Sequence, residues 1–220
     1  MKIKLLALIL FLVNILALNA QDFPKGIYMS IDEVQNKEPS LAYTLLSERR
    51  TIGEIKMSGG NDYRISSTTK LISKKDIKKN IAAYSNGDTL FLNCFKYNIQ
   101  LHYTPVLKHG RYLFFVAGIS QDENMYNYQI QESETSTFWS KVGGGIGGAI
   151  YGAKVAQLRF PYLVDLESNE LTYLNDFGLE ELLAKNSLAL LKRYREEKNR
   201  NDIPKSQLVL KYVDKLNELE

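Results

Sequence analysis

The sequence predicts an α+β protein, in which an antiparallel β-rich barrel or sandwich is followed by a glycine-rich helix, a β-hairpin and C-terminal helices. Two patterns predict this class. Short apolar runs separated by turn residues recur over residues 21–120, and apolar residues recur at spacings of three and four towards the C-terminus. A chain of 220 residues with 45% hydrophobic and 24% charged residues has the composition of a globular protein with a buried core.

The first of four expected parts is a signal peptide at residues 1–20. Lys2 and Lys4 precede an apolar run that ends at Leu18, and the small residue Ala20 stands before polar residues, which is the order found in secretory signal peptides. The run is too short for the roughly 30 Å hydrocarbon core of a bilayer, so a permanent span is the weaker alternative. We expect cleavage after Ala20 and export to the periplasm, the envelope surface or the extracellular space.

The charge balance argues against a nucleic-acid partner. The formal net charge is +3, and without Lys2 and Lys4 the 28 basic residues become 26 against 25 acidic ones.

Cys94 is the single cysteine, so the chain cannot form an internal disulfide and must be stabilised by its core. Leu90, Leu92 and Cys94 alternate along one strand, so we expect Cys94 to be a buried small hydrophobe rather than a catalytic thiol.

The second part, residues 21–120, is the β-rich body. Ser30 and Glu33 predict a capped helix at Ile31–Asn36, and Ser73 caps another helical turn. Asn86-Gly87 predicts a hairpin with a type I′ turn, because both central residues of that turn need positive φ. The expected strands are Tyr43–Ser47, Ile52–Met57, Tyr63–Ser66, Ile81–Tyr84, Thr89–Phe95, Ile99–Leu107 and Arg111–Gly118.

The third part is a polar loop at residues 121–137, which contains four acids and no base. The fourth part, residues 138–220, is expected to pack on the same domain as the β-rich body. It contains the glycine-rich helix, a hairpin formed by Arg159–Asp165 and Leu171–Leu174, and three helices marked by apolar residues at helical spacing.

Three stretches of the sequence are distinctive: Gly26–Glu33 followed by Lys37–Ser40, the glycine-rich apolar segment, and Tyr162–Glu167. With the order of the elements, they resemble an uncharacterised family of exported proteins found in Bacteroidota-like bacteria. The resemblance covers most of the mature chain. It implies export and the architecture given above, and it implies no activity.

One interpretation of the glycine-rich segment is dinucleotide binding. Gly143, Gly145 and Gly148 satisfy G-x-G-x-x-G, and Asp165 follows 17 residues after the third glycine. A dinucleotide site also needs a buried parallel strand before the glycines, so that helix N-terminal amides meet the pyrophosphate. The polar residues that precede Gly143 do not form such a strand, so we expect no cofactor.

The favoured interpretation of the same segment is a helix-packing face. Gly144, Gly148 and Gly152 recur every four residues and would leave one helix face almost without side chains, which permits close packing. The favoured partner surface is the protein's own β layer. The alternatives are a second copy of the chain or a membrane of the envelope, and a plain flexible loop that packs on nothing.

Five lysines lie within ten residues: Lys70, Lys74, Lys75, Lys78 and Lys79. One interpretation is contact with an anionic surface, such as lipid headgroups or an acidic polysaccharide. The alternative, which we favour from the sequence, is the solvated face of a short helix.

No arrangement of catalytic residues or metal ligands stands out. His102 and His109 lack the spacing of a metal site, and no pair of acids is singled out by a motif. We therefore expect a non-enzymatic exported binding protein or cell-envelope-associated protein, with self-association or envelope contact through the glycine-rich segment. The alternative is a secreted hydrolase whose carboxylates cannot be identified from the sequence.

Overall fold

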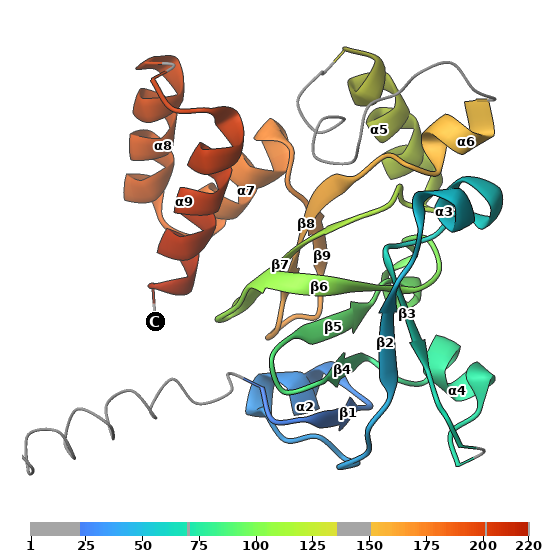
Figure 1. Ribbon diagram of the computed structural model, residues 1–220. Helices are drawn as coiled ribbons and strands as arrows, with labels where there is room; N and C mark the ends of the chain where they lie inside the picture. The colour runs from blue at the N-terminus through green and yellow to red at the C-terminus, as the bar shows by residue number, and fades with distance from the viewer. Residues whose placement is uncertain (1–22, 70, 136–150, 201, 220) are drawn as a thin grey trace, which may run out of the picture.

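The computed structural model describes residues 23–69, 71–135, 151–200 and 202–219 (Figure 1). Nine strands in these ranges form one antiparallel sheet with helices on both faces, which confirms the α+β class. The sheet does not close on itself within the described part of the chain, so it is an open sheet rather than a barrel. The expected signal peptide at residues 1–20 lies outside the described residues.

The sheet runs in the order β1-β4-β5-β6-β7-β8-β9, and β2 and β3 branch from the start of β6. The first residues of β6 pair with β5 and its last residues pair with β7, so β6 joins the two halves of the sheet. The strands are β1 (Gly26–Tyr28), β2 (Leu46–Arg49), β3 (Tyr63–Ser66), β4 (Ala83–Ser85), β5 (Leu90–Asn93), β6 (Tyr103–Lys108), β7 (Tyr112–Ala117), β8 (Phe160–Asp165) and β9 (Leu171–Tyr173).

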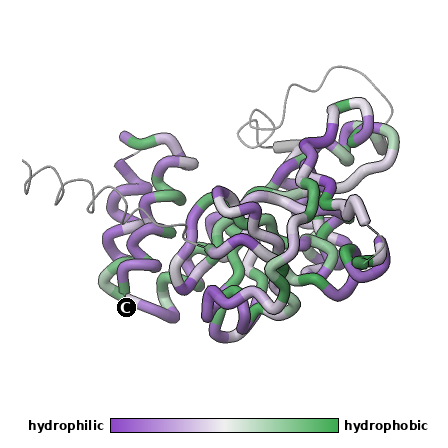
Figure 2. The backbone as a smooth tube through the Cα atoms, turned by 60° about the horizontal axis from the view of Figure 1, so that its bottom comes forward, coloured by the Kyte–Doolittle hydropathy of each residue, from purple (hydrophilic) through white to green (hydrophobic). Residues whose placement is uncertain are grey.

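Both faces of the sheet are buried, as β7 shows. Leu113 and Phe115 point into the main core, whereas Tyr112 and Phe114 point to the opposite face and pack against the C-terminal helices. These helices are α7 (Asp176–Asn186), α8 (Leu188–Arg200) and α9 (Lys205–Asn217), which confirms the three helices predicted for the tail. Hydrophilic segments are frequent along them in Figure 2, because only one stripe of each helix contacts the sheet.

Two short helices begin where their capping residues predict. The hydroxyl of Ser30 accepts a hydrogen bond from the backbone of Glu33 at the start of α2 (Ile31–Asn36). The hydroxyl of Ser73 accepts from the backbone of Asp76 at the start of α4 (Lys74–Lys79). The α4 helix covers a third apolar cluster, which includes Ile65, Ile77, Tyr84, Phe91 and Tyr103.

The strand predicted at Ile52–Met57 is wrong, because these residues form helix α3 (Ile52–Ser58). The hydroxyl of Thr51 accepts from the backbone of Glu54, and the Glu54 carboxylate accepts from the backbone of Thr51. This reciprocal capping box satisfies backbone donors at the helix start and outweighs the strand preference of the isoleucines.

The polar loop predicted at 121–137 is also wrong, because most of it forms helix α5 (Glu123–Thr135). Its start is capped by the carboxylate of Asp122, which accepts from the backbone of Met125. Gln129 is fully buried, where it accepts from the backbone of Ser120 and donates to the hydroxyl of Tyr162. A polar composition therefore concealed a helix that packs through a few residues at helical spacing.

The hairpin of β4 and β5 is confirmed, but its turn is not type I′. The backbone of Asn86 donates to the carbonyl of Thr89, so Gly87 and Asp88 are the two central residues. Gly87 has φ 103°, which matches the glycine required at the first central position of a type II′ turn. The Asn86 side chain accepts from the backbones of Asp88 and Thr89 and closes the loop.

Candidate functional site

Most of the glycine-rich segment lies outside the described residues. Gly144 and Gly148 lie outside the described residues, and Gly152 belongs to the short helix α6 (Tyr151–Val155). Asp165 lies in β8, where its carboxylate accepts from the guanidinium of Arg111 at 3.1 Å. That carboxylate is therefore engaged in an internal ion pair.

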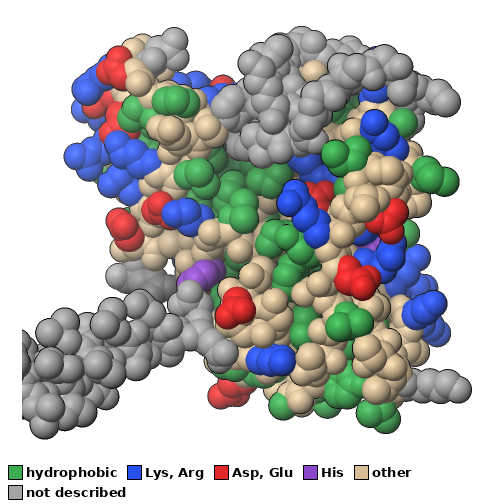
Figure 3. Space-filling model, in the orientation of Figure 1, with side chains coloured by type: hydrophobic (Ala, Val, Ile, Leu, Met, Phe, Trp, Pro, Cys, Tyr) green, Lys and Arg blue, Asp and Glu red, His purple; other side chains and the backbone are tan. Residues whose placement is uncertain are grey.

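The lysine cluster lies on α4, except for Lys70, which is outside the described residues. Lys74, Lys75, Lys78 and Lys79 are all exposed, and Figure 3 shows the lysine and arginine side chains of this region along the right-hand edge of the molecule. Lys74 and Lys78 line a cavity of about 660 Å³ between α4, β3 and the residues before β6, whereas Lys75 and Lys79 do not. We call it the basic cavity.

The basic cavity combines an apolar floor with a cationic rim. Arg64 and His102 join the two lysines at the rim, and four hydroxyl side chains, from Ser66, Ser67, Thr69 and Ser73, add hydrogen-bonding groups. Among the described residues, no carboxylate lines it. The floor consists of Ile65, Ile72, Ile77, Leu101 and Tyr103. Its volume falls within the range of sites for small ligands, and its lining suits an anion that carries an apolar part.

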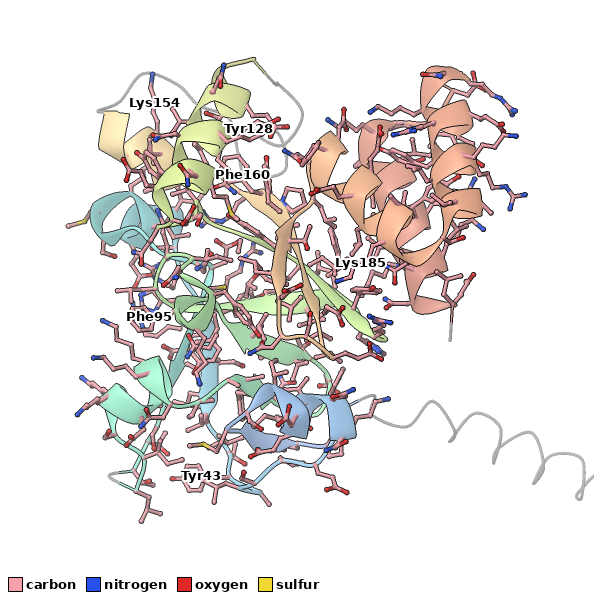
Figure 4. The ribbon with its side chains drawn as sticks, turned by 180° about the vertical axis from the view of Figure 1, so that it is seen from behind. Tyr43, Phe95, Tyr128, Lys154, Phe160 and Lys185 are labelled. Carbon is pink, nitrogen blue, oxygen red and sulfur yellow. The ribbon has the colours of Figure 1, made fainter. Side chains whose placement is uncertain are left out.

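The two cavity lysines are available to a ligand. Among the described residues, neither Lys74 nor Lys78 forms an ion pair, and the ammonium of Lys78 lies 4.9 Å from the centroid of the Phe95 ring. Figure 4 shows Phe95 beside α4. The third cation, Arg64, is paired with the Glu54 carboxylate at 2.6 Å. Hydrogen bonds from the Thr51 backbone, foremost, and from Arg64 lower the pKa of Glu54 to about 2.

Hydrogen bonds from side chains of the sheet hold α4 in place as one wall of the basic cavity. The carboxamide of Asn93 donates to the carbonyls of Ile77, Lys78 and Ile81, and the hydroxyl of Tyr103 donates to the carbonyl of Ile77. These carbonyls lie at the C-terminal end of α4, where the helix offers them no donors of its own. The sheet therefore fixes the position of α4 and, with it, the helix face that bears Lys78.

His102 lines the same cavity as the lysines and Arg64 but carries no charge at neutral pH. Burial, foremost, and the nearby guanidinium groups of Arg50 and Arg64 lower its pKa to about 4. Its backbone has φ 76°, in the left-handed region that non-glycine residues seldom adopt. The His102 ring lies against Gly60. A side chain at position 60 would place its Cβ atom only 2.8 Å from Cδ2 of His102. His102 therefore supplies polar ring nitrogens to the cavity, without a charge at neutral pH.

Two further cavities of about 620 Å³ lie elsewhere. One contains the ion pair of buried Arg159 and half-buried Asp62, whose Nη2 and Oδ1 atoms are 2.5 Å apart. The other contains Lys37, Arg111 and Glu167. Each of these two linings includes one carboxylate. In the described ranges, no three His, Cys, Asp or Glu residues are grouped so as to hold a metal ion.

The expectation that Cys94 is a buried small hydrophobe is confirmed. Cys94 is fully buried in the main core with Leu90 and Leu92, at the start of the short 3₁₀ helix η1 (Cys94–Tyr97). Burial raises the pKa of its thiol well above the ordinary value, so the reactive thiolate is suppressed.

Within the described part of the chain, no helix combines the length and hydropathy that crossing a bilayer requires.

Comparison with known proteins gives one match. The model of a family described as a family of unknown function (DUF6563) matches residues 26–220. No curated protein and no solved structure matches the chain.

Proposed function

Since the chain belongs to the DUF6563 family, whose description states no activity, we propose a function from the basic cavity: a non-enzymatic, exported protein of the cell envelope that binds an anionic ligand with an apolar part. The observation that supports this proposal is the position of Lys74 and Lys78. Both line the cavity together with five apolar residues, and no carboxylate is among its described lining residues. An anion bound there would gain two charge-assisted contacts while its apolar part leaves water.

The hydrolase alternative finds less support in the described cavities. Glycoside hydrolysis needs two carboxyl groups facing one bond, and one of them must be held protonated by a raised pKa. Counting the described lining residues, the basic cavity has no carboxylate, and each of the other two has one. The described carboxyl groups with shifted pKa values are all shifted downwards, as for Glu33, Asp165 and Glu180.

The export part of the proposal is supported by the charged start and short apolar run of residues 1–20. An envelope location would place the basic cavity near anionic polymers and lipids. The glycine series at 144, 148 and 152 is proposed as a packing face for a second copy or an envelope surface.

The binding proposal is tested with anilinonaphthalenesulfonate, an anion whose aromatic rings fluoresce more strongly in apolar sites. The test variant, Lys74→Glu/Lys78→Glu, reverses both cavity lysines. The matched control, Lys75→Glu/Lys79→Glu, makes the same charge change on the same helix outside the cavity. We expect the test variant to weaken binding of the dye by about tenfold or more, which corresponds to ~1.4 kcal/mol.

The control variant should bind within about twofold of the unchanged protein, because the lysines it alters face solvent. Equal losses in the two variants would show a general charge effect and would refute the cavity as the site. Circular dichroism and urea unfolding of both variants check that the fold is retained.

A further inference from the structure

Within the described part of the chain, strand β3 has an edge along the basic cavity that is mostly unpaired. One edge of β3 pairs with β2 over its full length, from Tyr63 to Ser66. The other edge pairs with β6 at a single position, Tyr63 with Tyr103. Beyond that position, Arg64, Ile65 and Ser66 line the basic cavity, and no described strand pairs with them on this side.

The ladder between β3 and β6 stops because the chain turns at His102. Continued antiparallel pairing would place His102 opposite Arg64 and Leu101 opposite Ile65. Instead, His102 adopts φ 76°, and the carbonyl of Leu101 accepts from the backbone of Asn61 at 2.7 Å. The residues before β6 are therefore directed away from β3, which leaves the edge open.

Helix α4 forms the opposite wall, so the basic cavity is a groove between a strand edge and a helix. In Figure 1, α4 lies beside β3 on the side away from β2. An unpaired edge presents backbone N–H and C=O groups that can pair with an added strand. The floor residues Ile72, Ile77 and Leu101 offer an apolar surface to the side chains on one face of such a strand.

We propose that the ligand of the basic cavity is an extended acidic peptide segment of another protein, which adds a strand to β3. This inference rests on the proposed function, because it names the ligand class of the same site. Charge complementarity selects an acidic peptide, since Lys74 and Lys78 are free of ion pairs with described carboxylates. A lipid or a free anion could use the lysines and the floor, but only a peptide also uses the open edge of β3.

The probes are a short peptide of alternating valine and glutamate, two N-methylated analogues of it, and dodecanoate. One analogue is methylated at every odd residue and the other at every even residue, so each loses the backbone donors of one edge. Binding to the full mature chain, labelled with nitrogen-15, is followed by NMR. We expect the parent peptide to shift the amide signals of Arg64, Ile65 and Ser66, and to slow solvent exchange only for those of the three N–H groups that point away from β2.

One methylated analogue should bind at least about tenfold more weakly than the parent peptide, and the other should bind as the parent does, because only one peptide edge pairs with β3. The Lys74→Glu/Lys78→Glu variant should lose binding of the parent peptide, whereas Lys75→Glu/Lys79→Glu should keep it.

Equal binding of both analogues and the parent would overturn strand addition. Binding of dodecanoate without binding of the peptide would also overturn it, while leaving the proposed binding function intact. If neither probe shifts a cavity signal, both the peptide inference and the proposed function fail.

Discussion

The carboxamide of Asn93 donates a hydrogen bond to the carbonyl oxygen of Ile81 at 2.8 Å. Asn93 ends β5, and Ile81 follows the C-terminal turn of α4, so this bond ties the sheet to the helix that bears the cavity lysines. The same carboxamide reaches the carbonyls of Ile77 and Lys78, and its oxygen accepts from the backbone of Phe95. One buried side chain therefore connects α4, β5 and η1.

Replacing Asn93 should destabilise the protein and loosen α4. Asn93→Ala removes the donor to three carbonyls near the end of α4 and leaves buried polar groups without partners, which costs about 1–3 kcal/mol. Urea unfolding measures the loss. Asn127→Ala, at an exposed position on α5, is the control and should change stability by less than about 0.5 kcal/mol. Equal stabilities of the two variants would show that the Asn93 network does not hold α4.

Cys94 should be structural and protected from reagents. Cys94→Ser places a hydroxyl in an apolar site and should lower the unfolding free energy by about 1–2 kcal/mol, while binding of the dye by folded protein is retained. In the unchanged protein, Ellman's reagent should react with the thiol only after denaturation, because the side chain is fully buried. Rapid reaction in the native state would contradict this account.

His102 should make stability depend on pH. Its folded-state pKa of about 4 lies below the ordinary value of 6.5, so the unfolded chain binds more protons between these two values. The unfolding free energy should therefore rise with pH across this window and level off above it. His102→Asn removes the titrating group with a residue that tolerates positive φ. Urea midpoints of the two proteins across this pH range should show a shallower rise in the variant, and parallel curves would refute the prediction.

Export should remove the first residues of the chain. The sequence pattern predicts processing between Ala20 and Gln21. Mass spectrometry of protein purified from its native source should give an N-terminus near Gln21. Mature material that retains Met1 would exclude cleavage at this position and would remove the support for an exported protein.

Capping side chains, which bond a backbone N–H group three residues further on, were sufficient to predict several helix starts. Ser30 and Ser73 each lie immediately before the helix that they cap, so the starts of α2 and of α4 follow from short spacings. The start of α3 has the same signal in Thr51 and Glu54, and this signal outweighs the strand preference of Ile52 and Ile55 on which the strand prediction depends. Helix α5 packs through Met125, Gln129 and Ile130, which lie four and five residues apart. The segment around them is mostly polar, so its apolar periodicity is too weak to predict a helix.

The candidate site was predictable only in part. The lysines of α4 stand out in the sequence, but their division into two that line a cavity and two that do not depends on the rotation of α4 against the sheet. Arg64 and His102 reach the same cavity from β3 and from the turn before β6. No local pattern links these residues, because they are brought together by the branching of β3 from β6 and by the left-handed backbone of His102.

The most direct test of the basic cavity as a ligand site is a crystal structure of the protein with anilinonaphthalenesulfonate bound. We expect the sulfonate within hydrogen-bonding distance of the ammonium groups of Lys74 and Lys78, with the rings against Ile72 and Ile77. A dye molecule bound in the cavity near Lys37 and Arg111 instead, with the groove between α4 and β3 empty, would contradict it.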